Sequence, residues 1–344
     1  MTSRGGYRYA LEILRADGSP VDQRPAQLAW GPAVEWGRWQ LARRGWPVAD
    51  ALLAEVVIRP VWSAAGAPYV GGVEVLAPPA TGAADDRLDV VPIEYFGDAA
   101  SALARILVGE GQLTDGEVFR YLPLAFAEGE PIEPPAARAV RTAPGINVVP
   151  GALAEALAGG CSEGDQDGDD APVLIPGDVL AECAALTLEH SGVETGGVLI
   201  GRLVRDGASA KIYLEVTAQV AARHTEASAT KLTFTPETWN DVRAAIALRG
   251  LGEIQLGSWH SHPVKVMCTC PEEKWRAGCP LGLGFFSADD RVLHRTVFSR
   301  AFNVALVVSD VHEGPPTFAL FGWRRGVIER RGFHRIGALS HAAT

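Results

Sequence analysis

Apolar residues in the first third of the chain alternate with polar ones in short runs, a pattern typical of half-buried β-strands. Two of these runs are rich in Val and Ile and are separated by a Gly/Ala/Pro turn, which predicts a hairpin. The predicted strands are Tyr7–Leu14, the hairpin pair Leu53–Trp62 and Tyr69–Leu76, and Leu88–Phe96.

Helical spacing follows these strands. Asp98–Val108 has apolar residues at helical intervals, and a second helix is predicted from Thr114, because Thr114 and Glu117 fit a capping box. Strands followed by helices favour an α+β module. We therefore predict that residues 1–126 form an N-terminal α+β domain that serves as an accessory or recognition domain.

The next segment changes in composition. Residues 127–172 contain several prolines and end in the acidic, Gly-rich run GCSEGDQDGDD. Such runs bury too little apolar area to fold, so we interpret the segment as a linker and the acidic run as a solvated tether. A short helix is predicted within it, at Gly151–Ala158.

Residues 173–344 are predicted to form a second domain, in which strands and helices alternate. One helix is delimited by Thr235 as its N-cap and by Gly250 just beyond its end. Together the two domains predict a mixed α/β and α+β protein. The helices predicted here are Gly177–Glu189, 236–249 and Ser287–Phe298, and the strands are 195–204, Lys211–Gln219, Ile254–His260, Asn303–Ser309 and Phe318–Trp323.

Composition narrows the class of protein. A length of 344 residues suggests two domains, and 47% apolar with 21% charged residues is usual for a globular protein. No apolar run approaches the ~20 residues that span a bilayer. The first residues, Met1–Ala10, lack the apolar stretch of a secretion signal. We expect a cytoplasmic protein with no membrane partner.

Charge and cysteine content argue against a nonspecific nucleic-acid-binding protein and against a disulfide-bonded one. The net charge of −10 and the pI of about 5.3 argue against nonspecific nucleic-acid binding, which needs a basic face. Five cysteines, an odd number in a chain with no export signal, are expected to be reduced thiols or metal ligands.

A candidate metal site lies in GSWHSHP, residues 257–263. His260 and His262 are two residues apart at a strand end, so both rings project to the same side. Zinc binds imidazole and carboxylate, and a catalytic zinc keeps one position for water, so a third protein ligand is wanted. Asp290 is a plausible donor. Because Ser287-x-x-Asp290 is also an ordinary helix capping box, Asp290 is expected to act as a cap, as a ligand, or as both.

The order of these motifs is more specific than any one of them. A Glu, a Gly-rich strand, His-Ser-His-Pro and Ser-x-x-Asp occur in sequence, and this order resembles the JAMM (MPN+, JAB) zinc metalloprotease family of bacterial type. The resemblance covers about residues 173–325. The matching residues are Glu194 in ETGGVLIGRL, His260, His262 and Pro263 in WHSHP, and Ser287 and Asp290 in FFSADD.

The resemblance implies a JAMM-like β-sheet flanked by helices. It also implies that His260, His262 and Asp290 bind one catalytic zinc ion, that Glu194 is the general base for the zinc-bound water, and that Ser287 stabilises the oxyanion. The implied activity is that of an isopeptidase or peptidase which removes or trims a ubiquitin-like or sulfur-carrier protein. The implied partners are that protein or its conjugate, and an activating or conjugating enzyme of the same system.

The sequence departs from the family between the second His and the Ser. Residues 263–286 separate them here, a longer segment than the family usually has, which leaves Asp289 as a rival to Asp290. The Ser-x-x-Asp spacing favours Asp290.

The insert at residues 264–284 carries Cys268, Cys270 and Cys279. Three interpretations stay open: a second, structural zinc with a fourth ligand from elsewhere, a surface loop whose thiols are free or packed, or a cysteine in the catalytic zinc's open position. Each makes the insert a candidate lid or substrate-contact element.

The alternatives to a metalloprotease are a non-catalytic binding protein and a zinc deaminase. Many MPN relatives lack the metal ligands and act as scaffolds, so a non-catalytic binding protein is the alternative hypothesis. A zinc nucleobase deaminase would need His-x-Glu and Pro-Cys-x-x-Cys, which this chain lacks. The first domain is faintly similar to a ubiquitin-conjugating fold, but no cysteine precedes Cys161, so it cannot carry a thioester.

Other histidines and tryptophans are expected to pack rather than to bind ligands. His190, His224, His294 and His312 have no ligand-like neighbours in sequence, and the first domain's tryptophans are expected in its core or on a partner surface. Those tryptophans are Trp30, Trp36, Trp39, Trp46 and Trp62.

Overall fold

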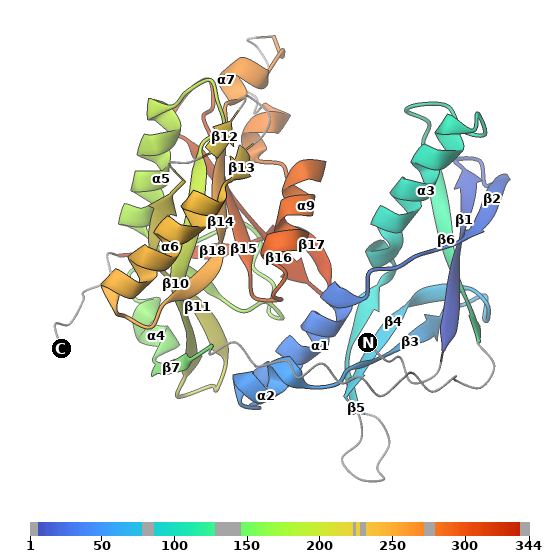
Figure 1. Cartoon of the computed structure of the whole chain (residues 1–344), viewed down its shortest axis with the longest axis horizontal. Helices are drawn as coiled ribbons and strands as arrows, with labels where there is room; N and C mark the ends of the chain where they lie inside the picture. Colours follow the sequence, from blue (N-terminus) through green and yellow to red (C-terminus); the bar gives the residue numbers. More distant parts are fainter. Residues whose placement is uncertain are drawn as a thin grey trace. The chain divides into compact units, whose positions relative to one another are not determined.

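The computed structural model of the chain describes residues 6–77, 86–127, 146–222, 225–227, 232–271 and 279–337. The chain divides into two compact units, one of Met1–Pro144 with Arg325–Val327 and one of Gly145–Arg324 with Ile328–Thr344. Both units mix helices and strands, as the sequence predicts (Figure 1). Within the ranges given above, no helix is long and apolar enough to cross a membrane.

The first unit contains two antiparallel three-stranded sheets, with strand orders β2-β1-β6 and β3-β4-β5. Trp36 and Trp39 of its first helix are buried in the core, whereas Trp46 and Trp62 are exposed. The strands are β1 (Tyr7–Arg15), β2 (Pro20–Pro25), β3 (Val57–Trp62), β4 (Val70–Ala77), β5 (Asp86–Pro92) and β6 (Phe119–Ala127). The helices are α1 (Gly31–Arg43), α2 (Val48–Leu53), the 3-10 helix η1 (Ile93–Phe96) and α3 (Gly97–Gly109).

The strand at Tyr7, the hairpin of β3 and β4, and the helix at Asp98 are confirmed. The predicted helix at Thr114 is wrong. The Glu117 carboxylate does accept a hydrogen bond from the Thr114 N–H at 2.9 Å, as in a capping box. However, Gly116 takes a φ of 80°, which turns the chain out of a right-handed helix and into β6. The strand predicted to end at Phe96 ends at Pro92.

The second unit is built on one large mixed sheet with the strand order β17-β16-β15-β14-β10-β11-β9-β18-β8, and β7 pairs with β10. The central strand β14 lies antiparallel to β10 and parallel to β15. The strands are β7 (Val148–Gly151), β8 (Cys161–Glu163), β9 (Val173–Pro176), β10 (Gly196–Asp206), β11 (Ile212–Ala221), β14 (Ile254–His262), β15 (Val304–Ser309), β16 (Thr317–Arg324), β17 (Val327–Arg331) and β18 (Phe333–Ile336), with β12 (Thr225–Ala227) and β13 (Leu232–Phe234) in a separate pair.

Two helices of the second unit, α5 and α6, pack against this sheet (Figure 1). Val242 of one helix joins Val198 and Ile200 of β10 in a buried cluster. That helix ends as predicted, with Gly250 in the left-handed region at a φ of 64°. The helices are α4 (Leu153–Ala156), α5 (Gly177–Glu189), α6 (Pro236–Arg249), α7 (Val264–Met267), the 3-10 helix η2 (Pro280–Leu283) and α9 (Ala288–Val297).

Part of the segment predicted to be a linker is folded in the structure. Residues 146–172 belong to the second unit, where β7 pairs with β10, and β8, inside the acidic run, pairs with β18. Asp170 of the same run forms an ion pair with Arg324 at 2.5 Å. The tether interpretation of the acidic run is therefore wrong, because strand pairing and an arginine hold it against the sheet. Residues 128–145 of the expected linker lie outside the described residues.

Candidate metal centre

The end of β14 carries the two histidines of the His-Ser-His motif. Their alternation along the strand places both rings on one face, as the spacing predicts. Both are buried, with 5% of His260 and 1% of His262 exposed. The two Nε2 atoms lie 3.2 Å apart, so they point toward a common position.

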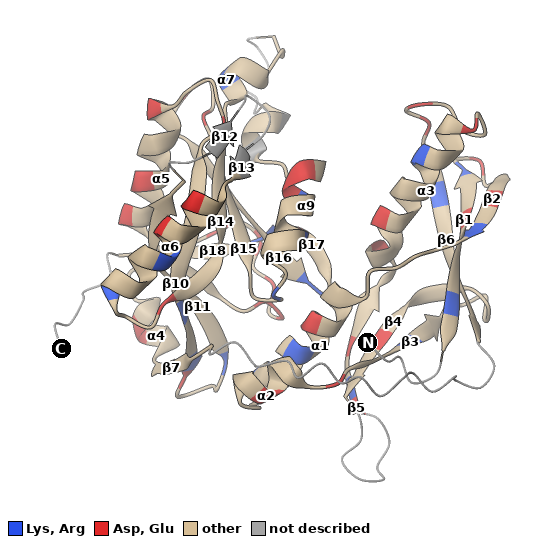
Figure 2. Cartoon of the chain, in the orientation of Figure 1, with Lys and Arg blue, Asp and Glu red and all other residues tan. Residues whose placement is uncertain are grey.

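The third residue comes from the first turn of α9, where Asp289 and Asp290 make the ribbon red in Figure 2. Asp290 Oδ1 lies 3.3 Å from His260 Nε2, and Oδ2 lies 3.9 Å from His262 Nε2. Asp289 is exposed. The structure therefore brings Asp290, and not its neighbour, to the histidines.

Asp290 is also a helix cap. Its Oδ2 accepts a hydrogen bond from the Ser287 N–H at 2.8 Å, and its own N–H donates to Ser287 Oγ at 3.1 Å. This reciprocal pair is a complete capping box. The cap fixes where α9 begins and so aims the carboxylate at the histidines. The same residue thus serves in both of the ways that the sequence left open.

One donor atom from each of His260, His262 and Asp290 lies within 4.8 Å of the others. Two imidazole nitrogens and a carboxylate oxygen form a donor set that suits zinc and other divalent transition metals. The donor set and its convergence therefore fit a metal ion.

Burial and neighbouring charges shift the pKa values of the two histidines and Asp290. Burial and the neighbouring charge of His260 lower the pKa of His262 to about 3. Burial also lowers the pKa of His260, but the hydrogen bond and charge of Asp290 outweigh it and raise that pKa overall. Burial raises the pKa of Asp290, and the contacts with His260 and Ser287 reverse this and bring it well below its usual range. Near neutral pH, His262 is thus neutral and Asp290 ionised, as metal ligands must be.

Glu194 lies beside these residues, two positions before β10, and is 5% exposed. Burial raises the pKa of its carboxyl group to about 7, against the opposing charge of His260, with smaller contributions from Asp290 and Asp289. A carboxyl group with this pKa can both accept and release a proton near neutral pH.

Ser261, between the two histidines, connects Glu194 to β14. Its Oγ accepts a hydrogen bond from the Thr195 N–H at 2.9 Å, and its own N–H donates to the Thr195 carbonyl oxygen at 2.7 Å. Thr195 is the residue after Glu194, so these two bonds hold the Glu194 backbone against the metal-site strand. Ser261 was not identified from the sequence, because its role depends on the register of β10 against β14.

The Gly-rich start of β10 allows this close packing. A Cβ atom at Gly197 would lie 2.7 Å from Trp259 Nε1, on β14, and would also meet the Val220 carbonyl oxygen. Trp259 Nε1 donates to Gln219 Oε1 at 2.9 Å. A larger residue at Gly197 would therefore push apart the strands that carry Glu194 and the histidines.

No protein-family model matches the chain, and no curated protein matches it. Among solved structures, the chain is similar to a Desulfitobacterium hafniense protein whose structure was determined in solution by a structural genomics consortium. The two are 20% identical over 49% of this chain and 97% of that one, with a TM-score of 0.34. This likeness is too slight to carry an argument about fold or function.

Two phenylalanines directly after the insert pack against the histidines and were not identified from the sequence. The Phe285 ring stacks on the His262 imidazole with centroids 4.2 Å apart. Phe286 lies 6.2 Å from the His260 ring and stacks on Phe321 at 4.8 Å. The aromatic rings limit the rotation of both imidazoles.

The insert's three cysteines form a group of their own. The sulfur atoms of Cys268, Cys270 and Cys279 all lie within 4.8 Å of one another. Among the residues that the structure describes, no cysteine sulfur belongs to the group formed by the histidines and Asp290. The arrangement therefore argues against a cysteine in the catalytic zinc's open position.

Among the described residues, no other histidine joins the group formed by His260, His262 and Asp290. His294 is buried among aromatic rings, including Phe286, Phe298 and Trp323, and burial lowers its pKa to about 3. The expectation that it packs is confirmed. His190 is exposed at the end of α5, and His224 lies outside the described residues.

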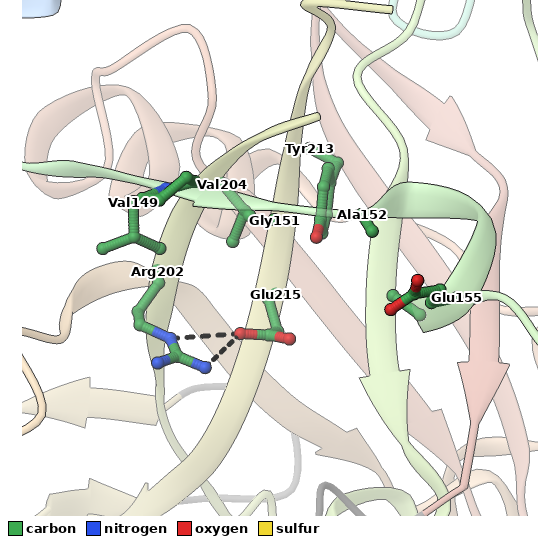
Figure 3. A pocket seen from close by; sticks show the side chains of 10 residues that line it. Val149, Gly151, Ala152, Glu155, Arg202, Val204, Tyr213 and Glu215 are labelled. Atoms are coloured by element: carbon green, nitrogen blue, oxygen red, sulfur yellow. Dashed lines mark hydrogen bonds and ion pairs between the residues drawn. The ribbon is translucent and has the colours of Figure 1, made fainter. Parts of the chain in front are cut away.

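A separate pocket of about 320 Å³ lies between β7, α4 and the strands β10 and β11 (Figure 3). Its charged residues include Arg202 and Glu215, which form an ion pair at 2.5 Å. The pair neutralises both charges, and none of the metal-site residues lines the pocket. The metal site therefore remains the candidate functional site.

Proposed function

We propose that the second unit is a zinc-dependent hydrolase of the JAMM (MPN+) type, which removes or trims a ubiquitin-like or sulfur-carrier protein. The observation that carries this proposal is the convergence of His260, His262 and Asp290 beside the buried Glu194. The order of the motifs along the chain supports it. Neither feature would be needed in a scaffold protein.

The donor set supports zinc as the metal. His260, His262 and Asp290 would hold the ion through two imidazole nitrogens and one carboxylate oxygen, a donor set found in catalytic zinc sites that also bind water. When bound, zinc lowers the pKa of a coordinated water toward ~7 and polarises the carbonyl group of the substrate.

Glu194 and Ser287 supply the remaining chemistry. The Glu194 carboxylate accepts the proton of the attacking water and returns it to the leaving amine, for which a pKa of about 7 is well suited. Ser287 Oγ accepts a hydrogen bond from the Asp290 N–H, so its own hydroxyl proton stays available to donate to the oxyanion.

The substrate is proposed to present an extended C-terminal tail, joined by a peptide or isopeptide bond to a target. The first unit is proposed to recognise the modifier, or an activating or conjugating enzyme that acts with it. It has no cysteine, so it does not itself carry a thioester.

The test uses the full chain loaded with zinc, and a ubiquitin-like protein whose C-terminal tail is fused to a second protein. Wild type should cleave the fusion, whereas Glu194→Gln should retain zinc and lose cleavage, because only the proton acceptor is removed. Glu189→Gln, which removes an exposed carboxylate at the end of α5, is the matched control and should cleave normally. Cleavage by Glu194→Gln at the wild-type rate would refute the assigned role. Binding of the modifier by zinc-loaded wild type without cleavage would favour the scaffold alternative.

A further inference from the structure

The insert between His262 and Ser287 holds a second group of potential metal ligands. It consists of Cys268, Cys270 and Cys279, whose sulfur atoms lie within 4.8 Å of one another. Cys279 is buried, and the other two are half-buried. The fold thus brings together Cys268 and Cys279, which are eleven positions apart in sequence.

The spacing of the sulfur atoms is close to that of a zinc thiolate site. With Zn–S bonds of about 2.3 Å, tetrahedral geometry places sulfur ligands about 3.8 Å apart. The Cys268 and Cys279 sulfur atoms are 3.2 Å apart, and no pair in the group exceeds 4.8 Å. Small side-chain rotations therefore suffice to surround one ion.

A disulfide accounts for the group less well. All five cysteines of the chain lie in its described part, and their thiols are not joined in disulfides. A Cys268–Cys279 bond would need a sulfur–sulfur distance of about 2.05 Å and would leave Cys270 without a role. A metal ion uses all three thiolates at once.

Local structure holds the cysteines in place. Cys268 caps the C-terminus of α7, with its N–H donating to the Val264 carbonyl oxygen at 2.8 Å, and Cys279 is the N-cap of η2. The Cys270 N–H donates to the Cys268 sulfur at 3.3 Å. Amide hydrogen bonds of this kind stabilise the negative charge of a metal-bound thiolate.

Both ends of the insert are also fixed to the sheet. The Lys265 N–H donates to Asp310 Oδ1 at 3.2 Å, and Thr317 Oγ1 donates to the Gly282 carbonyl oxygen at 2.6 Å. The cysteine group thus lies between two anchored segments. One of these segments leaves His262, and the other leads to Phe285, which stacks on His262.

We propose that Cys268, Cys270 and Cys279 bind a second zinc ion, distinct from the one at the histidines, which joins the two ends of the insert beside the catalytic site. Soft thiolates select zinc over the hard cations magnesium and calcium. The fourth position takes water or a further donor. Binding releases the protons of the coordinating thiols. This proposal does not depend on the hydrolase activity.

The test measures zinc content in the full chain, with the two sites separated by substitution. Wild type should contain two zinc ions, and His260→Ala/His262→Ala should retain the one at the cysteines. In that double variant, cobalt substitution should give the intense near-ultraviolet absorption of thiolate–cobalt bonds. Replacing all three insert cysteines with Ser should remove that absorption and one zinc equivalent. Cys161→Ser, an exposed thiol on β8, is the control and should change neither.

A second measurement uses the chain without substitution of the cluster, in case the triple variant does not fold. Titration of Cys161→Ser with an organomercurial, which binds thiolates, should release one zinc equivalent to a colorimetric dye. Retention of one zinc equivalent by the folded triple variant of the His260→Ala/His262→Ala chain would overturn the proposal. So would the absence of mercurial-released zinc, or a Cys268–Cys279 disulfide in the zinc-treated protein.

Discussion

Ser261→Ala tests how Glu194 is held beside the histidines. The substitution removes the Oγ that accepts the Thr195 N–H at 2.9 Å, and it leaves the backbone bond from the Ser261 N–H in place. Ser261 is 1% exposed, so water does not readily replace the lost acceptor. The only heavy atom removed is the hydroxyl oxygen, so the cavity left behind is small and adds little to the loss of stability.

The expected loss follows from the unsatisfied donor. The bond from the Thr195 N–H is part-buried, so leaving this donor without its partner costs about 1 kcal/mol, the low end for a buried donor, which lowers the melting temperature of a unit of this size by roughly 2–4 °C. Glu194 should also lose its fixed position. Hydrolysis should therefore fall about 10- to 100-fold while zinc content is unchanged, since misplaced catalytic groups reduce rate without removing ligands.

Calorimetry of the full chain measures the unfolding of the second unit, and metal analysis measures its zinc. Ser309→Ala is the matched control, because Ser309 is equally buried on the neighbouring strand β15 and its Oγ has no hydrogen-bond partner among the described residues. Because no hydrogen bond is lost, the control should not lower the stability of the unit. Equal stability and equal activity of the two variants would refute the reasoning.

Two further predictions concern α9. Asp290→Ala removes both a proposed metal ligand and half of the capping box, so this variant should lose zinc from the histidine site and about 1 kcal/mol of stability. The control Asp289→Ala, at an exposed position, should retain zinc. Metal analysis and urea unfolding distinguish the two variants. His294 has a pKa of about 3 in the folded chain and about 6.5 when unfolded, so the unfolded state binds more protons between these values and stability is lost as pH falls through this window. Urea unfolding at pH 6.5 and 5 should show wild type losing about 2 kcal/mol more than His294→Phe, and an equal loss in both would contradict the prediction.

Most elements of the second unit follow from local signals in the sequence. Thr235 and Gly250 delimit α6 because an N-cap and a left-handed C-cap act within a single turn. The first unit was less predictable. Helix α1 was not predicted, and it contains Gly37, a residue type that is unfavourable in a helix. Glycine is nevertheless required at this position, because a Cβ atom at Gly37 would lie 2.5 Å from Val75 Cγ1 of β4.

Long-range pairing explains what the sequence could not show. The acidic run reads as a tether because its partners, β18 and Arg324, lie far along the chain. The histidines could be identified from their alternation on one strand. Ser261 and Phe285 could not, because their roles depend on the register of β10 against β14 and on the path of the insert.

The central claim is that His260, His262 and Asp290 hold a zinc ion and that Glu194 is the general base beside it. Anomalous diffraction at the zinc absorption edge, from crystals of the full chain grown with zinc, tests this claim most directly. We predict a peak about 2.0–2.2 Å from both Nε2 atoms and from an oxygen of Asp290, with the Glu194 carboxylate beside the remaining position. A zinc-saturated crystal with no peak among these three residues would contradict the account.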